Sequence, residues 1–487
     1  MKLVSPTKIL LPEDSDRVKS FLTYDDLSVK FQISRLKQNV RFRQGDPEKF
    51  LERMAELKEE QNKCLLQYDE DGNPYTYSGL WQDLSLRFGW NLENEIGRPE
   101  EEDMSIIPWK RVPHKPRYYQ EEAFEALAKI GHGAIELPTG SGKTLIIMNL
   151  LKRFPVKTLI ITPFSNITNQ LRVDLEEAFG AKQVGQLGDK RKKVDRLFTV
   201  ANAQSATRVE PGSKEWDELS QCEMVIFDES HMVPSESFRK ICLSGVGKDA
   251  RLRFFVSATQ TRTDGSAMLL KGVTGPIVYR KSYKDLAKEG YLKEIKSRVF
   301  AVSPAKSSVS DPKKETRANL YNNPNVARLA CMLAEKAYTL ADRQVVILIE
   351  EYSQFLLLKN HMKIPYEFAH GTVTKDQKEL LPEQYWKCDT EQIISDFNKG
   401  VLPCIIGTTA IATGVDIKPT GCIIYLQGGT SEIKVKQGVG RGTRPVAHKE
   451  LWVCDFRVSG SKVLERHADN RKKIYETLTD QSIDEIG

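Results

Sequence analysis

The chain has 487 residues with a formal net charge of +6 at pH 7, and 40% of its residues are hydrophobic while 28% are charged. This composition describes a globular protein of two or three domains and excludes a low-complexity or short-repeat chain. We find no apolar run long enough to span a membrane and no secretory leader, so we expect a cytosolic protein, bacterial or from a phage-infected host, with no membrane partner. The eight cysteines are scattered without a C-x-x-C pair, which argues against a disulfide framework or a zinc site. The net charge permits a nucleic-acid partner without demanding one.

The amino-terminal region differs in composition from the rest of the chain. Alternating residues in Leu27–Ile33 predict a half-buried strand, and Pro47–Gln61 has the spacing of an amphipathic helix. Two short runs, Cys64–Tyr68 and Tyr75–Tyr77, flank a turn-rich loop and predict a hairpin. We therefore expect a small α/β accessory domain over residues 1–110 that recognises the DNA substrate, followed by a linker containing prolines.

Short apolar strands alternate with amphipathic helices in the remainder of the chain, which predicts an α/β fold of two tandem parallel sheets flanked by helices. The first domain is expected over residues 111–300, with strands Gly133–Leu137, Thr158–Thr162, Leu197–Val200, Met224–Phe227 and Leu252–Ser257. The second is expected over residues 301–487, with strands Gln344–Ile349, Cys404–Gly407, Cys422–Leu426 and Leu451–Cys454. A carboxyl-terminal helix, Lys462–Leu478, completes the second domain.

A glycine-rich loop follows the first of these strands and predicts a phosphate-binding site. Gly140 and Gly142 allow the backbone N–H groups to point inward at an anion, at the start of an apolar helix. Lys143 is placed to reach the β- and γ-phosphates, and the Thr144 hydroxyl to ligate Mg²⁺. The full pattern has glycine where Leu137 stands, and the alternative is a glycine-rich turn with an incidental lysine. The loop residues expected to bind ATP are Pro138, Thr139, Gly140, Ser141, Gly142, Lys143 and Thr144.

A second acidic element appears downstream, where the apolar strand Met224–Phe227 runs directly into Asp228 and Glu229. Ligands of α/β sheets bind at the carboxyl ends of strands, so Asp228 suits a Mg²⁺ ion held through water. Glu229 suits the general base that polarises the attacking water. The alternative is a strand that ends in a solvated acidic turn.

Four motifs occur in the order Leu137–Thr144, Asp228–His231, Ser257–Thr259 and Gln437–Arg444. Together they resemble superfamily 2 helicases and translocases over about Lys115 to Val458. The resemblance implies two RecA-like domains, with ATP in the cleft between them and nucleic acid across their tops. Further stretches, Ser257–Gly265 among them, look like those of XPB-like and UvsW-like enzymes.

The family resemblance assigns roles to further residues. Arg117 and Gln120 are expected to grip the adenine, and Gly414 and Asp416 to face the ribose. The sequence-blind contacts to the nucleic-acid backbone are assigned to Thr162, Pro163, Phe164, Asn202, Gln204, Ser205, His370, Thr409 and Thr413. In this interpretation the arginines Arg441 and Arg444 act as an arginine finger that reaches the γ-phosphate. The residues expected to act in catalysis are Lys143, Asp228, Glu229, Gln437, Arg441 and Arg444.

Two features depart from or extend this pattern. The element Ser257–Thr259, which would couple hydrolysis to domain movement, is followed by Gln260 where many relatives have proline, and we regard that change as neutral. The basic run Asp189–Lys193 lies between two expected backbone-contact segments, so a DNA role is reasonable, although most such runs are merely solvated.

The sequence therefore predicts an ATP- and Mg²⁺-dependent DNA helicase or translocase, expected to be monomeric. By resemblance to UvsW-like enzymes it would unwind and remodel branched DNA, such as forks and Holliday junctions, in recombination, repair or replication. The alternative is a DNA-stimulated ATPase that translocates on or senses duplex DNA without separating strands, as a restriction-type translocase subunit or remodeller does. Unwinding depends on a wedge that no motif encodes, so the motifs leave both functions open.

Overall fold

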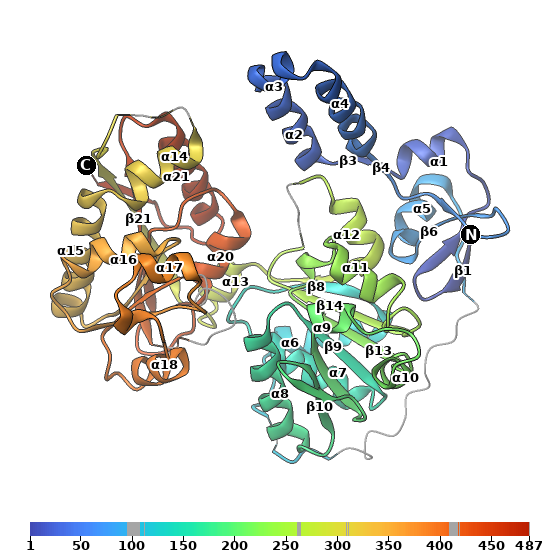
Figure 1. Ribbon diagram of the computed structural model, residues 1–487. Coiled ribbons are helices and arrows are strands. Elements are labelled where there is room, and N and C mark those ends of the chain that lie inside the picture. The colour runs from blue at the N-terminus through green and yellow to red at the C-terminus, as the bar shows by residue number, and fades with distance from the viewer. Residues whose placement is uncertain are drawn as a thin grey trace. The chain divides into compact units, whose positions relative to one another are not determined.

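The computed structural model describes residues 1–94, 108–111, 113–260, 264–307, 309, 311–408, 417 and 419–486. Contacts between Cα atoms divide the chain into two compact units. The first contains Met1–Leu137 and Lys143–Arg280, and the second contains Pro138–Gly142 and Lys281–Gly487. Figure 1 labels the elements of each.

The first unit is built on an eight-stranded sheet with the order β11-β10-β12-β9-β13-β14-β8-β15. All pairs are parallel except β10 with β11. The strands are β8 (His132–Glu136), β9 (Thr158–Thr162), β10 (Val184–Gly188), β11 (Arg191–Lys193), β12 (Phe198–Asn202), β13 (Met224–Asp228), β14 (Leu252–Ser257) and β15 (Ile277–Arg280). The five strands predicted from apolar runs are confirmed. Strands β10, β11 and β15 were not predicted. Strands β10 and β11 lack such a run, and β15 contains only the three residues Ile277–Tyr279 of one.

Helices flank this sheet: α6 (Tyr118–Ile130), α7 (Lys143–Arg153), α8 (Ser165–Phe179), α9 (Ala203–Thr207), α10 (Lys214–Leu219), α11 (Glu236–Leu243) and α12 (Ala267–Thr274). Helix α8 illustrates why they form, because Leu171, Leu175 and Phe179 recur every four residues and are buried. The parallel order places the carboxyl ends of the strands at one edge, and the loops that carry the predicted motifs leave the sheet there.

The amino-terminal region forms a second, five-stranded sheet with the order β5-β6-β2-β1-β7, beside a two-stranded pair β3-β4. The strands are β1 (Lys2–Ser5), β2 (Lys8–Leu10), β3 (Thr23–Asp25), β4 (Asn62–Cys64), β5 (Gln67–Tyr68), β6 (Pro74–Tyr77) and β7 (Glu93–Asn94). The helices are α1 (Asp16–Phe21), α2 (Leu27–Gln38), α3 (Val40–Gly45), α4 (Pro47–Gln61) and α5 (Trp81–Phe88). The predicted helix at Pro47–Gln61 is confirmed, as is the hairpin, in which β5 pairs antiparallel with β6.

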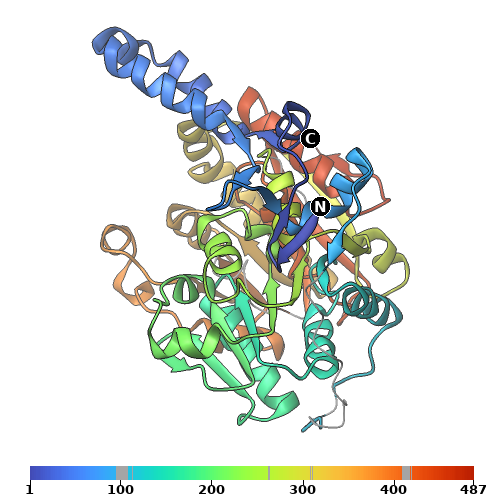
Figure 2. The same cartoon turned by 90° about the vertical axis from the view of Figure 1, so that its right-hand side faces the viewer.

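The predicted strand at Leu27–Ile33 is wrong, because these residues begin helix α2. The Asp26 side chain accepts hydrogen bonds from the backbone N–H groups of Ser28 and Val29 and so caps the helix. Val29 and Ile33, four residues apart, pack against α4, and α2 and α4 run side by side in both views (Figures 1 and 2). The prediction from alternating residues took no account of this capping aspartate. Helices α2 and α4 form a helical hairpin, in which Phe31 of α2 is exposed.

The amino-terminal region shares a hydrophobic core with the first parallel sheet. Ile9, Leu80 and Leu84 belong to one cluster with Leu269 and other residues of α12. A Cβ atom on Gly79 would lie 2.3 Å from a carbonyl oxygen of α12, so this backbone approach needs glycine. Lys271 Nζ lies 2.6 Å from a carboxylate oxygen of Asp83. The two parts of the first unit are therefore packed together over an apolar face, and the limit at residue 110 stays a prediction.

The second unit is a seven-stranded parallel sheet with the order β18-β19-β17-β20-β21-β16-β22. Its strands are β16 (Glu294–Val302), β17 (Gln344–Leu348), β18 (Tyr366–Ala369), β19 (Cys404–Gly407), β20 (Thr420–Tyr425), β21 (Glu450–Val458) and β22 (Asp484–Ile486). Its helices are α13 (Tyr283–Lys288), α14 (Pro312–Thr316), α15 (Pro324–Ala341), α16 (Tyr352–Lys359), α17 (Lys375–Leu380), α18 (Thr390–Asn398), α20 (Glu432–Gly440) and α21 (Lys462–Glu476). We expected this domain to begin at residue 301, whereas β16 already pairs with β21 from Glu294 onward.

The predicted carboxyl-terminal helix corresponds to α21, which is held to β21 by a buried ion pair. Arg471 Nε donates to Asp455 Oδ2 at 2.7 Å, and Arg471 Nη2 donates to Asp455 Oδ1 at 2.9 Å. The Tyr475 hydroxyl donates to the same carboxylate at 2.8 Å. Burial lowers the pKa of Arg471, but the charge of the Asp455 carboxylate and its hydrogen bonds to the guanidinium hold that pKa above its usual range.

Among the described helices, none combines the length and the hydropathy needed to cross a membrane. All eight cysteines are free thiols. Cys64 is exposed and Cys388 is half-buried, whereas the other six are buried. Burial raises the pKa of Cys222 and of Cys242 to about 12.

Candidate nucleotide and nucleic-acid site

The phosphate loop leaves the carboxyl end of β8 and enters helix α7 at Lys143. Gly140 and Gly142 have φ angles of 86° and 81°, a conformation that a residue with a Cβ rarely adopts. Lys143 Nζ donates to the carbonyl oxygen of Leu137 at 3.4 Å. The left-handed glycines and the start of a helix are the backbone features that an anion site requires.

The acidic pair stands at the carboxyl end of β13. The Asp228 carboxylate accepts a hydrogen bond from the Glu229 N–H at 2.9 Å, and Glu229 has a φ of 52°. A non-glycine residue in this left-handed conformation costs about 1–2 kcal/mol, so the fold holds Glu229 in strain. Burial raises the pKa of Asp228, the Glu229 carboxylate raises it further, and the Lys143 ammonium lowers it. A desolvated carboxylate pair beside the phosphate loop fits a divalent cation such as Mg²⁺.

His231 links this acidic pair to the neighbouring strand. Its Nδ1 lies 2.9 Å from Ser257 Oγ at the end of β14 and 3.3 Å from Glu229 Oε2. Both His231 and Ser257 are buried. The element Ser257–Thr259, predicted to couple hydrolysis to movement, is therefore in direct contact with the predicted catalytic element.

Gln260, which we regarded as neutral in the sequence, is bonded at the centre of the site. Its N–H donates to Glu136 Oε2 at 2.9 Å, and its Nε2 donates to Ser230 Oγ at 2.8 Å. The same Nε2 lies 3.3 Å from the carbonyl oxygen of Ile135. Gln260 thus ties β8 to the segment after β13. Sequence reasoning missed Gln260, Glu136 and Ser230, and the departure from proline was the only signal available.

The residues expected to grip adenine form the start of helix α6. Arg117 is the N-cap residue, and its N–H donates to Gln120 Oε1 at 2.8 Å. Arg117 Nη1 donates to the Tyr119 hydroxyl at 3.0 Å. Gln120 is 4% exposed. The structure gives both residues a role in capping the helix, and their contact with a base remains a prediction.

The expected backbone-contact segments of the first unit meet at the carboxyl edge of the sheet. Phe164 is 45% exposed at the start of α8, next to Pro163, and Gln204 is exposed on α9. Asn202 Nδ2 donates to Ser165 Oγ at 2.9 Å, which joins the two segments. The Asn202 Oδ1 atom accepts from the Ser205 N–H at 2.8 Å. Asn202 is therefore used to cap α9 and to hold the two segments together.

Thr162 is placed differently from the prediction. Its side chain is fully buried, and its Oγ1 lies 2.6 Å from Thr168 Oγ1. The hydroxyl is not available to a nucleic acid in this structure. The sheet explains the result: because it is parallel and covered on both faces, every residue of β9 is buried.

His370 is likewise turned into the second unit. It is 3% exposed, its Nδ1 lies 2.7 Å from the Gly371 carbonyl oxygen, and its ring packs against Phe368. The structure supports a packing role for His370 and not a surface contact. The other predicted residues of this region, Thr409, Thr413, Gly414 and Asp416, lie outside the described residues.

The arginine motif of the second unit begins on α20, which carries Gln437 and ends at Gly440. Arg441 is the C-cap residue of this helix, and Arg444 follows in the next turn. A Cβ atom on Gly442 would lie 2.6 Å from a Leu451 methyl group, and one on Gly438 would lie 3.0 Å from Leu348. These contacts confirm that the glycines serve a close backbone approach, here to the sheet beneath the helix.

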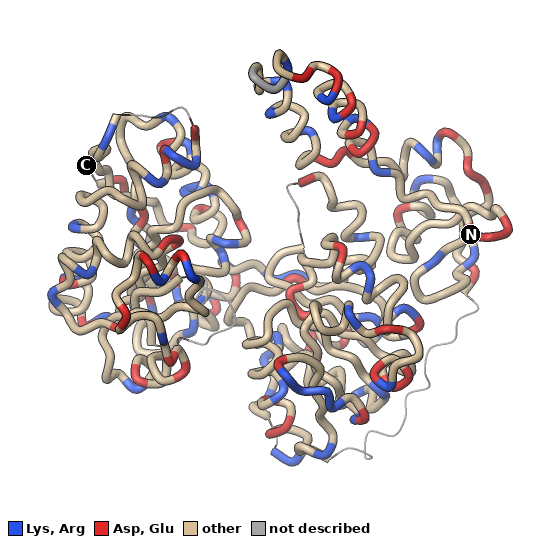
Figure 3. Tube along the Cα trace, in the orientation of Figure 1, with Lys and Arg blue, Asp and Glu red and all other residues tan. Residues whose placement is uncertain are grey.

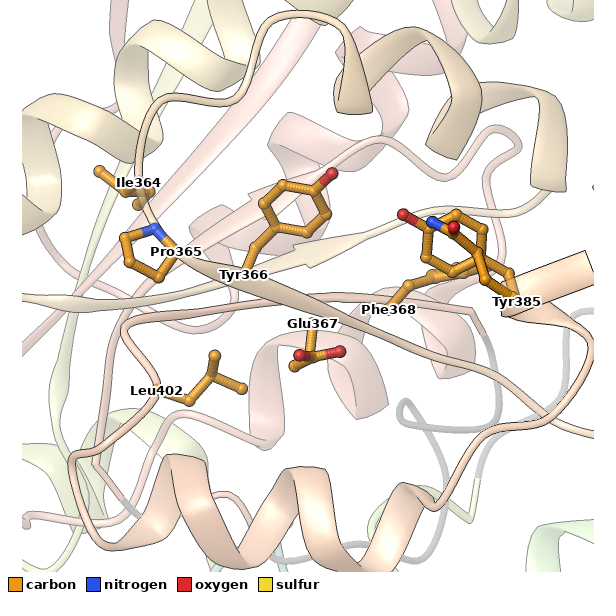
Figure 4. A pocket seen from close by; sticks show the side chains of 8 residues that line it. Ile364, Pro365, Tyr366, Glu367, Phe368, Tyr385 and Leu402 are labelled. Atoms are coloured by element: carbon orange, nitrogen blue, oxygen red, sulfur yellow. The ribbon is translucent and has the colours of Figure 1, made fainter. Parts of the chain in front are cut away.

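A pocket of about 540 Å³ lies elsewhere in the second unit, along strand β18 at the edge of the sheet. Figure 4 shows Tyr366 and Glu367 pointing to opposite faces of this strand. The pocket is lined by Ile364, Pro365, Tyr366, Glu367, Phe368, Gln384, Tyr385 and Leu402. None of them is a predicted site residue, so the pocket is not part of the nucleotide site.

Comparison with protein families assigns both halves of the motor. Residues 113–262 match the family described as Type III restriction enzyme, res subunit, and residues 325–445 match the Helicase conserved C-terminal domain. The first range contains the phosphate loop and the acidic pair, and the second contains the arginine motif. Together these matches support a DNA helicase or translocase of superfamily 2. The predicted RecA-like fold is confirmed by the same matches.

Individual relatives of this superfamily 2 protein are distant. It is 26% identical over 406 residues to the DNA 3'-5' translocase XPB2 of Sulfurisphaera tokodaii, which covers 76% of this chain and 89% of that protein. It is 27% identical over 223 residues to the DNA 3'-5' helicase XPB of Kineococcus radiotolerans, which covers 44% of this chain and 38% of the relative.

Solved structures show the fold alone. A fragment of a putative HsdR subunit of a type I restriction enzyme from Vibrio vulnificus superposes with a TM-score of 0.57 at 16% identity, covering 86% of this chain and 77% of that one. T4 UvsW superposes with a TM-score of 0.42 at 17% identity, covering 100% of this chain and 99% of that one. The predicted closeness to UvsW-like enzymes therefore stays a prediction.

Proposed function

We propose that this protein is an ATP-driven DNA helicase that unwinds and remodels branched DNA. One observation carries the proposal: beside the phosphate loop, His231 Nδ1 lies within hydrogen-bond distance of Ser257 Oγ, at 2.9 Å, and 3.3 Å from Glu229 Oε2. A binding module has no use for a strained carboxylate at the end of a buried strand, tied to the next strand by a buried histidine. Such a link suits an enzyme in which hydrolysis moves a neighbouring element.

In the proposed reaction the loop N–H groups and Lys143 hold the triphosphate, and Thr144 and Asp228 hold Mg²⁺. The metal, when bound, neutralises charge on the β- and γ-phosphates. Glu229 orients the attacking water and accepts its proton. His231 fixes the Glu229 carboxylate through the contact described above, and Arg117 and Gln120 receive the adenine.

The second unit supplies the remaining groups. We assign Arg441 and Arg444 to the charge that develops on the γ-phosphate, a role that contributes about 10³-fold or more in related enzymes. Gln437 orients this pair, and Gly414 and Asp416 face the ribose. Recombination, repair and replication of DNA are the processes in which such an enzyme would act.

DNA is the proposed substrate, with contacts to the phosphodiester backbone. The exposed residues Phe164 and Gln204, with the half-buried Ser205 next to Gln204, suit such contacts in the first unit. Thr409 and Thr413 are proposed for the second. Because these groups contact phosphates and sugars and not bases, the affinity for DNA would depend on salt concentration and hardly on base sequence.

We assign the selection of branched DNA to the helical hairpin α2–α4. It carries exposed apolar residues, with Phe31 at 69% and Leu51 at 66% exposure, and exposed basic residues such as Lys37. Exposed apolar side chains flanked by positive charge suit a junction, where bases are unpaired and phosphates are dense. The hairpin has its own small core of Val29, Ile33, Met54 and Leu57.

The structure offers a clean way to test this assignment. Asp25 pairs with Asn62 across β3 and β4, so residues 26–61 form an insertion that begins and ends at adjacent strands. Replacing them with an Asn-Gly turn would close a two-residue hairpin and leave the shared core with α12 intact. We expect this variant to retain ATP hydrolysis stimulated by single-stranded DNA and to lose preference for forks and four-way junctions. Unchanged junction preference in the folded variant would reject the assignment.

Strand displacement on forked, flush-ended and four-way DNA tests the proposal as a whole. The wild-type protein should separate strands in the presence of ATP and Mg²⁺, and Lys143→Ala should bind DNA without hydrolysing ATP. Wild-type turnover by Lys143→Ala would mean that the phosphate loop is assigned wrongly.

The second candidate is translocation on duplex DNA without strand separation. It is favoured by the relative that the chain matches over 89% of its length, whose name is DNA 3'-5' translocase. A triplex-displacement assay separates the two functions, because a duplex translocase removes a third strand from intact duplex. Removal of the third strand without any unwinding of forks would favour this candidate.

A further inference from the structure

The hairpin of β10 and β11 carries an unbroken basic run that the proposed chemistry does not use. Lys190, Arg191, Lys192 and Lys193 follow one another from the turn into β11, and all four are exposed. Lys192 lies 3.4 Å from a carboxylate oxygen of Glu215. Within the described part of the chain, the other three have no ion pair. Figure 3 shows the run as a continuous blue segment next to β10.

The turn itself is strained in an unusual way. Asp189 and Lys190 have φ angles of 51° and 61°, the left-handed pair of a two-residue hairpin turn. Asn-Gly meets this geometry at little cost, whereas a lysine at the second position carries a steric penalty. The chain keeps a positive charge at the tip of the hairpin where a glycine would make the turn more stable.

Hydrogen bonds fix this tip to the start of α8. Asn169 on α8 donates through Nδ2 to Asp189 Oδ2 at 2.8 Å, and Asn169 Oδ1 accepts from Gln186 Nε2 at 2.7 Å. The hydrogen-bond partner of the Asp189 carboxylate is therefore an amide of α8 and not the adjacent lysine. The hairpin is held rigidly relative to the segment that begins at Phe164.

The last residue of β10, next to the turn, also lies close to α9. Gly188 has a φ of 115°, and a Cβ atom there would lie 3.0 Å from both Asn202 Nδ2 and Ser205 Oγ. The beginnings of α8 and α9 and the hairpin tip therefore form one surface at the carboxyl edge of the sheet. The two helix starts are the segments proposed above to contact the nucleic-acid backbone.

We propose that the β10–β11 hairpin is a further nucleic-acid contact, in which Lys190, Arg191 and Lys193 bind consecutive phosphates of the DNA backbone. The inference rests on the proposed function and extends its substrate surface. Charge complementarity selects the partner, because three cations without carboxylate partners lie on the same rigid edge as the proposed backbone contacts. β11 is also the edge strand of its sheet, where basic residues prevent pairing with other chains. Lys190 lies in the turn, outside that strand, so edge protection does not explain it.

The test measures DNA affinity by fluorescence anisotropy over a range of salt concentrations, with single-stranded and forked DNA. For the double variant Arg191→Gln with Lys193→Gln, we expect the slope of log affinity against log salt to become shallower by about 1.4–1.8, or 0.7–0.9 for each lost contact. ATP hydrolysis without DNA should stay at the wild-type level. The matched control is Lys182→Gln, an exposed lysine in the turn that leads into the opposite end of β10, which should keep the wild-type slope.

Lys190→Gly separates the binding role from a structural one. It relaxes the turn, so the melting temperature should rise, while the salt slope should become shallower by about 0.7–0.9. A more stable protein with an unchanged slope would overturn the role of Lys190. If wild type binds DNA and neither this variant nor the double variant alters the slope, the hairpin proposal fails alone. If wild type shows no salt-dependent DNA binding, the proposed function fails with it.

Discussion

His231 Nδ1 lies 2.9 Å from Ser257 Oγ, and this contact joins the element after β13 to the element after β14. The same imidazole nitrogen lies 3.3 Å from Glu229 Oε2. One buried ring thus touches both the proposed general base and the element that follows the neighbouring strand. A change in the position of Glu229 during hydrolysis would reach the end of β14 through this ring.

We expect Ser257→Ala to separate hydrolysis from mechanical work. The variant also loses the bond that Ser257 Oγ accepts from the Thr259 N–H. Losing the bond to His231, of about 1–1.5 kcal/mol, corresponds to about tenfold in a rate or an equilibrium. DNA-stimulated ATP hydrolysis should therefore survive, while strand displacement per ATP should fall by about tenfold. Ser257→Thr keeps the hydroxyl and should restore the coupling. Equal loss of both activities in Ser257→Ala would instead point to a general defect of the site.

Glu229→Gln should bind ATP and stall before chemistry. The amide keeps the size of the side chain but cannot accept the proton of the attacking water, so turnover should fall by about 10²–10⁴-fold. Nucleotide binding, measured with a fluorescent ATP analogue, should remain within a few-fold of wild type. Near-normal turnover would place the base at another residue.

Gln260→Leu should destabilise the first unit. The substitution removes the hydrogen bonds to Ser230 and to the Ile135 carbonyl, and leaving buried polar groups unsatisfied costs about 1–3 kcal/mol. Urea denaturation should detect a decrease of that size in the free energy of unfolding. Gln221→Leu, at an exposed glutamine, is the matched control and should have little effect. Equal stability of Gln260→Leu and wild type would return this position to the neutral role inferred from sequence.

Stability should fall in mild acid because of His132. Burial, with a smaller contribution from Arg253, lowers the pKa of His132 from its usual 6.5 to about 3, while its Nε2 bonds to the Val273 carbonyl. Between pH 6.5 and 3 the unfolded chain binds a proton that the folded chain does not, so stability is complete above pH 6.5 and declines below it.

Between pH 7 and pH 5, the protonation of His132 in the unfolded chain should lower the free energy of unfolding by about 1–2 kcal/mol. Urea denaturation of wild type and His132→Gln at several pH values measures the difference between them. The free energies of the two proteins should converge as the pH falls, because glutamine donates the same bond without titrating. Parallel pH profiles would show that His132 does not titrate in this window.

The elements of the fold that could be predicted from the sequence were the strands made of uninterrupted apolar residues. Strands β9 and β14 were located to the residue, because a parallel sheet covered on both faces demands continuous Ile, Leu, Val and Phe. Strand β10, with Gly185 and Gln186 at its centre, offers no such run. Residues 27–33 also alternate in polarity, which predicts a strand, but the capping Asp26 and the four-residue spacing of Val29 and Ile33 are the features that the helix α2 uses.

Within the site, the backbone conformation of the phosphate loop was easier to predict than the hydrogen-bond and packing partners of the side chains. The left-handed glycines at 140 and 142 follow from the loop pattern alone. The buried positions of Thr162 and His370 do not, because they depend on Thr168 and Phe368, which tertiary packing supplies. Gln260 was missed for the same reason, since its partners Ser230 and Glu136 lie 30 and 124 residues away in the sequence.

The distribution of thiols has a practical consequence. Among the eight cysteines, all of which lie in the described residues, only Cys64 is exposed, on β4 at the foot of the α2–α4 hairpin. Burial suppresses the thiolate form of Cys222 and Cys242. A maleimide dye should therefore attach preferentially at one native position, without any cysteine being removed. That position adjoins the module assigned to branched DNA. The unmodified chain thus carries its own attachment point for a fluorescent reporter of junction engagement.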